Sequence, residues 1–187
     1  NEAFKKSGIR FQAAVTNCET GCAEYPVISD MFCDAEWIRA SSSLPFLANM
    51  VEMDGKLYMD GGIADSIPLA QSIRQGNEKN VVVLTRPRDY RKKAPSAASL
   101  RLMKLKYKAY PKMCEAYAER YKTYNRTLEL IEEEEAKGST FVIAPMGPLD
   151  IGRTEKNPDK LRKAYREGYL VAEALGEKLK SFLDGEQ

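Results

Sequence analysis

The segment Tyr58-Met59-Asp60-Gly61-Gly62-Ile63 places an acidic side chain directly before two glycines. Glycines allow a backbone turn that other residues would hinder, either through positive φ or because another segment can approach closely. A carboxylate held on such a turn could take a proton from a hydroxyl group. The same residues also suit an ordinary turn, in which Asp60 accepts a hydrogen bond from its own backbone. The chain has no histidine, so an acid or base here would work without an imidazole.

A carboxylate base requires a nucleophile, and three serines near Asp60 are candidates. Ser42 and Ser43 lack the small flanking residues that a strained strand-to-helix elbow requires. Ser66 stands before Pro68 and is better explained as a helix cap. We therefore expect all three serines to have structural roles.

The four cysteines are candidate metal ligands. Cys18, Cys22, Cys33 and Cys114 have irregular spacings, which fits free thiols in a reducing compartment. Zinc could in principle bind Cys18, Cys22 and Cys33, but the chain offers no histidine and no second close cysteine pair. The chain also lacks a glycine loop that would hold a phosphate. We predict neither a metal nor a cofactor.

Composition limits the other function classes. With 187 residues, 43% hydrophobic and 30% charged, the chain can form a globular domain with a real core. Its 29 basic and 27 acidic side chains nearly cancel, which argues against nucleic acid as a partner. A signal pattern and a membrane-spanning apolar run are both missing from the sequence, which favours a cytoplasmic location. The first residue is asparagine, so we expect a longer polypeptide of which this chain is part.

Apolar and β-branched runs predict four strands, at residues 9–16, 57–60, 80–86 and 140–144. The last two are continuous β-branched runs, typical of strands buried on both faces of a parallel sheet. They alternate with predicted helices. The sequence therefore favours an α/β fold with a mostly parallel sheet and helices on both faces.

Helical patterns follow at residues 34–40, 66–74, 99–110, 113–135 and 158–182. The last is the clearest, with Asn157 as its cap and Pro158 at its first position. Its apolar stripe predicts packing against the core and consists of Leu161, Ala164, Tyr165, Gly168, Tyr169, Ala172, Leu175, Leu179 and Phe182.

The region 86–112 is strongly basic, with ten Lys or Arg against the single Asp89. Arg101, Lys104 and Lys108 recur at helical spacing, and tyrosines are interleaved with them. This combination suits peripheral contact with anionic headgroups at a membrane surface. The alternative stays open, in which the basic side is a solvated helix face and the tyrosine side packs on the core.

Four segments together resemble the C-terminal half of bacterial patatin-like phospholipases: Arg39–Phe46, Asp60–Gly62, Asp65–Pro68 and Val81–Pro87. In that family a serine in a Gly-x-Ser-x-Gly elbow attacks an acyl ester, and the Asp of an Asp-Gly-Gly turn is its only side-chain partner. The resemblance implies that Asp60 is that aspartate, that Gly61 and Gly62 support the turn, and that Ser41, Ser42, Pro45 and Phe46 form a wall of the site.

The serine elbow and the family's oxyanion loop are both missing from this sequence. The resemblance therefore implies a lipid acyl hydrolase whose serine comes from an upstream segment of the same polypeptide, so that this chain alone is inactive. It further implies a three-layer α/β/α fold, of which residues 1–187 form the C-terminal part of one domain with a helical region at 97–137. A noncatalytic lipid- or partner-binding α/β module is the main alternative, and a nucleotide-binding α/β domain ranks last.

Overall fold

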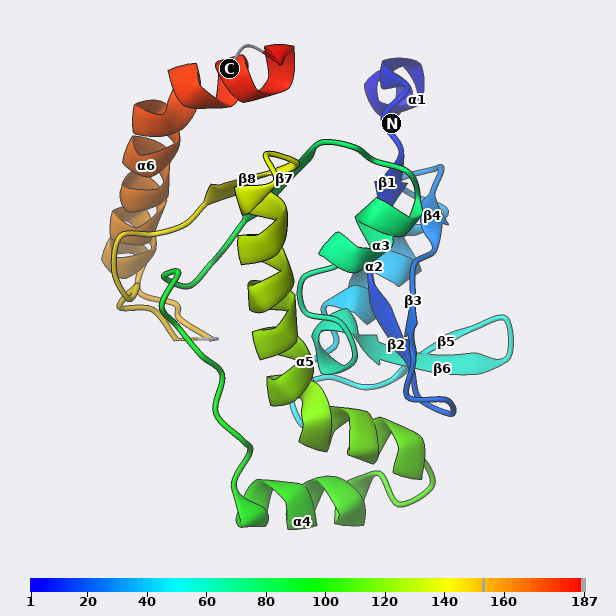
Figure 1. Cartoon of the computed structure of the whole chain (residues 1–187). Coiled ribbons are helices and arrows are strands. Elements are labelled where there is room, and N and C mark those ends of the chain that lie inside the picture. The colour runs from blue at the N-terminus through cyan, green and yellow to red at the C-terminus, as the bar shows by residue number, and fades with distance from the viewer. Residues whose placement is uncertain (153, 186–187) are drawn as a thin grey trace. The chain divides into compact units, whose positions relative to one another are not determined.

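The computed structural model describes residues 1–152 and 154–185, which form two compact units of mixed α/β structure. The first unit combines Asn1–Pro68 with Lys92–Arg126. The second combines Leu69–Arg91 with the described residues from Thr127 onward. Figure 1 labels the elements along the chain.

The first unit contains six strands in two antiparallel sheets. A four-stranded sheet has the order β3-β2-β6-β5, and β1 pairs separately with β4. The strands are β1 (Phe11–Gln12), β2 (Val15–Asn17), β3 (Ala23–Glu24), β4 (Val27–Ile28), β5 (Val51–Met53) and β6 (Lys56–Asp60). The helices are α1 (Glu2–Ser7), α2 (Ala35–Ser41), the 3-10 helix η1 (Gly61–Ile63), α4 (Ala97–Lys106) and the part of α5 (Pro111–Ala136) that ends at Arg126.

The predicted parallel arrangement is wrong for the strands of this unit. Val15 of β2 lies opposite Asp60 of β6 in an antiparallel ladder. Strand β5, which the sequence analysis missed, pairs antiparallel with β6 through a tight turn at Asp54 and Gly55. Both turn residues have positive φ, 52° and 73°. An Asp-Gly pair is a strong signal for a β-hairpin, and a hairpin joins only antiparallel strands.

Strand β6 is covered on both of its faces. Successive strand residues point to opposite faces of a sheet. Met59 accordingly packs in one buried cluster with Ile63, Met103 and Tyr107, while Tyr58 packs in a second cluster that contains Val15, Ala40 and Val51. The end of β6, and with it Asp60, is therefore held firmly in the core of the first unit.

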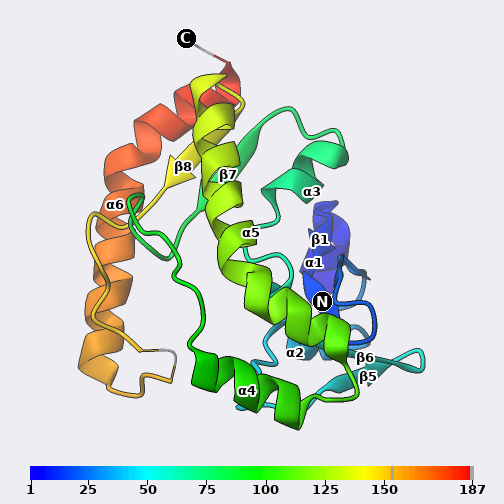
Figure 2. The same cartoon turned by 60° about the horizontal axis from the view of Figure 1, so that its bottom comes forward.

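The second unit contains β7 (Asn80–Val83) and β8 (Thr140–Ile143), together with α3 (Leu69–Arg74), α6 (Pro158–Asp184) and the end of α5. The predicted parallel pairing of these two strands is confirmed, with Asn80 opposite Thr140 and Val83 opposite Ile143. Figures 1 and 2 show them side by side. Predicted burial on both faces is wrong, because Val81 and Val83 are 41% and 68% exposed. Helix α6 therefore covers the face that carries Val83 and Ile143 only loosely.

Helix α6 begins and ends as its sequence indicates. The Asn157 side chain accepts hydrogen bonds from the backbone amides of Asp159 and Lys160, and the helix ends at Gly185 with φ 79°. The predicted core packing of its stripe is wrong, since no described residue of α6 is buried. The stripe touches β8 at Phe182, whose ring centroid lies 5.6 Å from that of Phe141. Tyr165 remains 74% exposed, so an apolar helix face is left largely open.

None of the helices within the described residues is both long and apolar enough to cross a membrane.

Candidate functional site

Asp60 is the last residue of β6 and caps the 3-10 helix that follows it. Its Oδ1 accepts a hydrogen bond from the Gly62 amide at 2.6 Å, which is the ordinary turn contact that the sequence allowed. The side chain is half-buried. Within residues 1–152 and 154–185, no hydrogen bond reaches Oδ2. The turn therefore fixes the orientation of the carboxylate and leaves one oxygen to accept a further donor.

Close approach explains both glycines of the turn. A β-carbon at position 61 would lie 2.2 Å from the carbonyl oxygen of Ala14, far inside van der Waals contact. One at position 62 would lie 2.8 Å from Asp60 Oδ1. Neither glycine has a positive φ. Of the two reasons for glycine that the sequence allows, positive φ is therefore excluded and close approach remains. Position 61 needs glycine because the backbone of Ala14 occupies the space, and a β-carbon at position 62 would displace the Asp60 carboxylate from its present place.

Thr16 of β2 anchors the turn from the neighbouring strand. Its fully buried side chain donates a hydrogen bond from Oγ1 to the Asp60 carbonyl at 2.8 Å and accepts one from the Ala64 amide at 3.3 Å. Sequence reasoning missed this residue. The available signal was a lone threonine at the end of the apolar run Ala13-Ala14-Val15, a pattern that also occurs in many strands without a role of this kind.

The serine-rich segment, residues 41–46, contacts Asp60 through its backbone. The Asp60 amide donates to the Ser43 carbonyl at 3.0 Å. The hydroxyls of Ser42, Ser43 and Ser66 donate to backbone carbonyls of Ile38, Arg39 and Gly62, at 3.0, 2.8 and 3.0 Å respectively. Donation to a carbonyl within their own segment gives each serine a structural role. Ser66 is not the predicted helix cap, because α3 begins at Leu69.

The predicted wall residues Ser41, Ser42, Pro45 and Phe46 belong to the same segment, and their side chains form no hydrogen bond with Asp60. Ser41, Pro45 and Phe46 are half-buried and Ser42 is exposed. Phe46 has a positive φ of 70°, its amide donates to the Tyr107 hydroxyl at 2.9 Å, and the two rings are 5.7 Å apart. This contact ties the segment to the start of the chain's helical region.

Arg120 of α5 also lies at the turn. Its Nη2 would be 3.4 Å from a β-carbon at position 62, and Ser66 Oγ would be 3.6 Å from the same point. A carboxylate, a guanidinium and a hydroxyl thus surround the open side of Gly62. Sequence reasoning missed Arg120, since a separation of some sixty residues leaves no local pattern to find.

The predicted surface residues Arg101, Lys104 and Lys108 are exposed, on α4 and in the turn after it. The other side of α4 carries Met103, which is fully buried, and Tyr107 follows the helix into the same cluster. The tyrosine side therefore packs on the core, as the alternative in the sequence analysis supposed, and the basic side chains extend into solvent.

All four cysteines are free thiols. Cys18 and Cys114 pack in the cluster that holds Met59, and burial raises the pKa of the Cys18 thiol to about 12. A thiol with such a pKa is not ionised near neutral pH, so it acts as a small apolar side chain. Cys22 and Cys33 are exposed. The described residues contain no cluster of three or more Cys, Asp or Glu side chains that could hold a metal ion.

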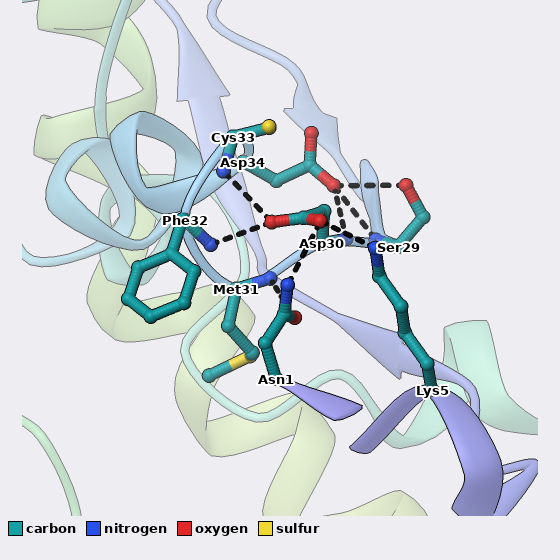
Figure 3. A network of polar contacts seen from close by, with 8 residues as sticks. All are labelled: Asn1, Lys5, Ser29, Asp30, Met31, Phe32, Cys33 and Asp34. Carbon is teal, nitrogen blue, oxygen red and sulfur yellow. Dashed lines mark hydrogen bonds and ion pairs between the residues drawn. The ribbon is translucent and has the colours of Figure 1, made fainter. Parts of the chain in front are cut away.

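A network of charged and polar groups precedes α2 (Figure 3). Asp30 Oδ2 contacts Lys5 Nζ at 2.6 Å and accepts from Asn1 Nδ2 at 2.9 Å. Asp30 Oδ1 accepts from the Phe32 and Cys33 amides, and Asp34 accepts from Ser29 and from the Asp30 amide. The Lys5 hydrogen bond lowers the pKa of Asp30, and backbone hydrogen bonds lower that of Asp34. Both oxygens of Asp30 and Oδ2 of Asp34 are engaged by groups of the chain itself, which indicates a structural turn.

The second unit has an apolar groove of about 430 Å³ where the carboxyl ends of β7 and β8 meet α6. Open α/β sheets bind ligands at this end of their strands. Polar groups in its lining are limited to Thr85 and to the tyrosines at positions 165 and 169 of α6. It offers no carboxylate or thiol, so it can hold an apolar group but provides no acid-base pair.

Comparison with known proteins gives two family matches in different parts of the chain. Residues 35–73 match the family described as patatin-like phospholipase. This stretch contains α2, the serine-rich segment, the β5–β6 hairpin, Asp60 and both turn glycines. Residues 110–184 match a domain of unknown function, DUF6363. The phospholipase match is thus narrower than the resemblance suggested, because the segment Val81–Pro87 lies outside it.

A curated protein of Escherichia coli (strain K12), named uncharacterized protein YjjU, is 47% identical over 51 residues. The aligned stretch covers 27% of this chain and 14% of that protein.

Proposed function

We propose that this chain is part of a lipid acyl hydrolase of the patatin-like type, with Asp60 as the partner of a nucleophilic serine. The short family match at residues 35–73 supports the hydrolase class. The observation that carries the proposal is the Asp60 carboxylate inside that match, with one oxygen fixed by Gly62 and the other open to a donor. The serine belongs to an upstream segment of the same polypeptide.

The proposed chemistry requires only these groups and an oxyanion site. The serine hydroxyl donates to Asp60 Oδ2, and its oxygen attacks the carbonyl carbon of the ester while the proton passes to the carboxylate. Backbone amides of the upstream glycine-rich loop stabilise the oxyanion. The tetrahedral intermediate collapses, and the alcohol leaves with the proton from Asp60. Water then repeats the sequence on the acyl serine, without a metal or cofactor.

The proposal also includes the fold of the longer polypeptide. Residues 1–187 form the C-terminal part of one patatin-like domain, with residues 97–137 as its helical region. The parallel pair of β7 and β8 becomes part of a larger sheet when upstream strands are added, which yields the three-layer arrangement. A sheet of two strands is marginal by itself, and within the described residues each strand of this pair has one edge without a partner strand, where further strands can pair. We place the protein in the cytoplasm.

The proposal is tested by comparing this chain with a longer polypeptide that includes the upstream serine elbow. The longer form is expected to hydrolyse a chromogenic short-chain ester and phosphatidylglycerol in mixed micelles, and to form a covalent adduct with a fluorophosphonate. This chain alone is expected to do neither. A longer form that folds, shown by circular dichroism, but has no activity and no adduct would contradict the proposal.

A second candidate function is a noncatalytic lipid- or partner-binding module. The exposed basic side of α4 favours it. Lipid binding without any fluorophosphonate adduct in the longer form would favour this second function over the first.

A further inference from the structure

Helix α4 carries two apolar sides, of which the structure buries one. Met103 packs in the core cluster with Tyr107. Leu102 and Leu105, three residues apart and therefore neighbours on the helix surface, are 53% and 74% exposed. Met103 is the only buried residue of α4, so the two leucines form an open apolar side of the helix, and exposed apolar clusters of this kind mark contact surfaces.

Basic side chains stand beside these leucines. At 3.6 residues per turn, Arg101 and Lys104 flank Leu105 on one side. Lys108 lies in the loop that follows α4. Two nearby cations of α5 have acidic partners: Lys112 lies 3.9 Å from Glu115, and Lys122 lies 2.6 Å from Glu119. Arg101, Lys104 and Lys108 form no ion pair with any described residue. The positive charge of this surface is therefore uncompensated.

The surface continues into a shallow hollow between α4 and the start of α5. Its volume is about 360 Å³, and Lys104, Lys108 and Glu115 lie on its border with Tyr107 and Pro111. Lys106 lies over the rings of Phe46 and Tyr107, at 5.6 and 5.4 Å from their centroids. In Figure 1, α4 is the short green helix joined by a tight loop to the start of α5. The hollow gives a phosphate group a place beside two ammonium groups.

We infer that this surface, made of Arg101, Leu102, Lys104, Leu105 and Lys108, docks on an anionic lipid bilayer. Leu102 and Leu105 enter the boundary between headgroups and acyl chains, and the three cations contact the headgroups. Charge complementarity and exposed apolar side chains on one helix face together define this occupant. Nucleic acid would satisfy the cations but not the leucines. The inference does not depend on Asp60 and concerns binding, so it can fail while the hydrolase proposal stands.

The test is co-sedimentation of the 187-residue chain with vesicles of phosphatidylcholine alone or mixed with phosphatidylglycerol. The chain is expected to sediment with the anionic vesicles and not with the neutral ones, and added salt should release it. Replacing Arg101, Lys104 and Lys108 together by Gln should lower the partition coefficient about a hundredfold, at roughly fivefold per cation. Leu102→Ser and Leu105→Ser should each lower it about tenfold.

Matched control variants use α6, which is equally exposed. Leu170→Ser changes a leucine that is 53% exposed, like Leu102. Replacing Lys163, Arg166 and Lys178 by Gln removes the same total charge from exposed positions of α6. Both controls should bind anionic vesicles as the unchanged chain does. Equal losses in the controls would overturn the assignment to α4, as would equal binding to neutral vesicles.

Fluorescence supplies a second measurement. The single tryptophan, Trp37, packs against Tyr58 with ring centroids 4.9 Å apart and provides a constant background. A Leu105→Trp variant should shift its emission to the blue when anionic vesicles are added, and a Leu170→Trp variant should not. Binding that needs the cations but leaves position 105 unshifted, and that a single-stranded oligonucleotide abolishes, would contradict lipid docking and indicate a general polyanion surface.

Discussion

At the scale of single residues, the Asp60 turn is set by space rather than by conformational freedom. Gly61 is buried against the backbone of Ala14, and Gly62 leaves room for the Asp60 carboxylate beside it. Thr16 fixes the Asp60 carbonyl, and the Ser43 carbonyl fixes its amide. Three hydrogen bonds, to the carbonyl, the amide and Oδ1 of Asp60, therefore hold this residue and its carboxylate in place.

Gly61→Ala should destabilise the fold by about 1–3 kcal/mol, because its β-carbon would collide with a backbone carbonyl that cannot turn away. Gly176→Ala is the matched control, since a β-carbon there would meet nothing within 4 Å. Alanine in a helix interior is favoured over glycine by roughly 1 kcal/mol, so this variant should be as stable or more stable. Urea unfolding measures both, and equal midpoints for the two variants would contradict the packing argument.

At the scale of elements, the sequence predicts where helices and strands lie in the chain better than it predicts what they pack against. The α6 cap, the start of α4 near Ser99 and the parallel pairing of residues 80–86 with 140–144 follow from local residue types and agree with the structure. The hairpin at Asp54 and Gly55 has a local turn signal, the Asp-Gly pair, from which strand β5 can be predicted. The exposure of the α6 stripe had no such signal, because periodicity shows that a helix has an apolar side but not what covers it.

The turn before α2 predicts a dependence of stability on pH. The pKa of Asp30 is lowered mainly by its hydrogen bond with Lys5, so the folded state favours the ionised carboxylate. The resulting stability is fully present above the ordinary carboxyl range, near about pH 4, and is lost as the pH falls below it toward the lowered pKa. Asp30→Asn should remove the Lys5 ion pair and flatten this acid limb.

Urea midpoints measured from neutral to acidic pH would test this expectation. Asp54→Asn is the control: its exposed side chain sits in the hairpin turn at φ 52°, where asparagine is well tolerated. The control should keep the acid decline of the unchanged chain. An Asp30→Asn variant that declines with acid as steeply as the control would show that the ion pair contributes nothing to stability.

At the scale of the whole molecule, the chain matches two families and divides into two compact units. The phospholipase match at 35–73 lies within the first unit except for its last residues, and the DUF6363 match at 110–184 extends over parts of both. Asp60 and its glycines could be chosen from sequence because the Asp-Gly-Gly pattern is local. Thr16 and Arg120 reach the turn from distant parts of the chain, and only tertiary structure brings them there.

The central claim is that Asp60 takes the proton of a serine supplied by the same polypeptide, and the turnover number of the longer form for a chromogenic ester tests it most directly. Asp60→Asn keeps the acceptor for the Gly62 amide but removes the base, so kcat should fall by a factor of roughly 10²–10⁴. Asp54→Asn, in the hairpin that leads to Asp60, should leave kcat unchanged. An Asp60→Asn enzyme with undiminished kcat would contradict the account.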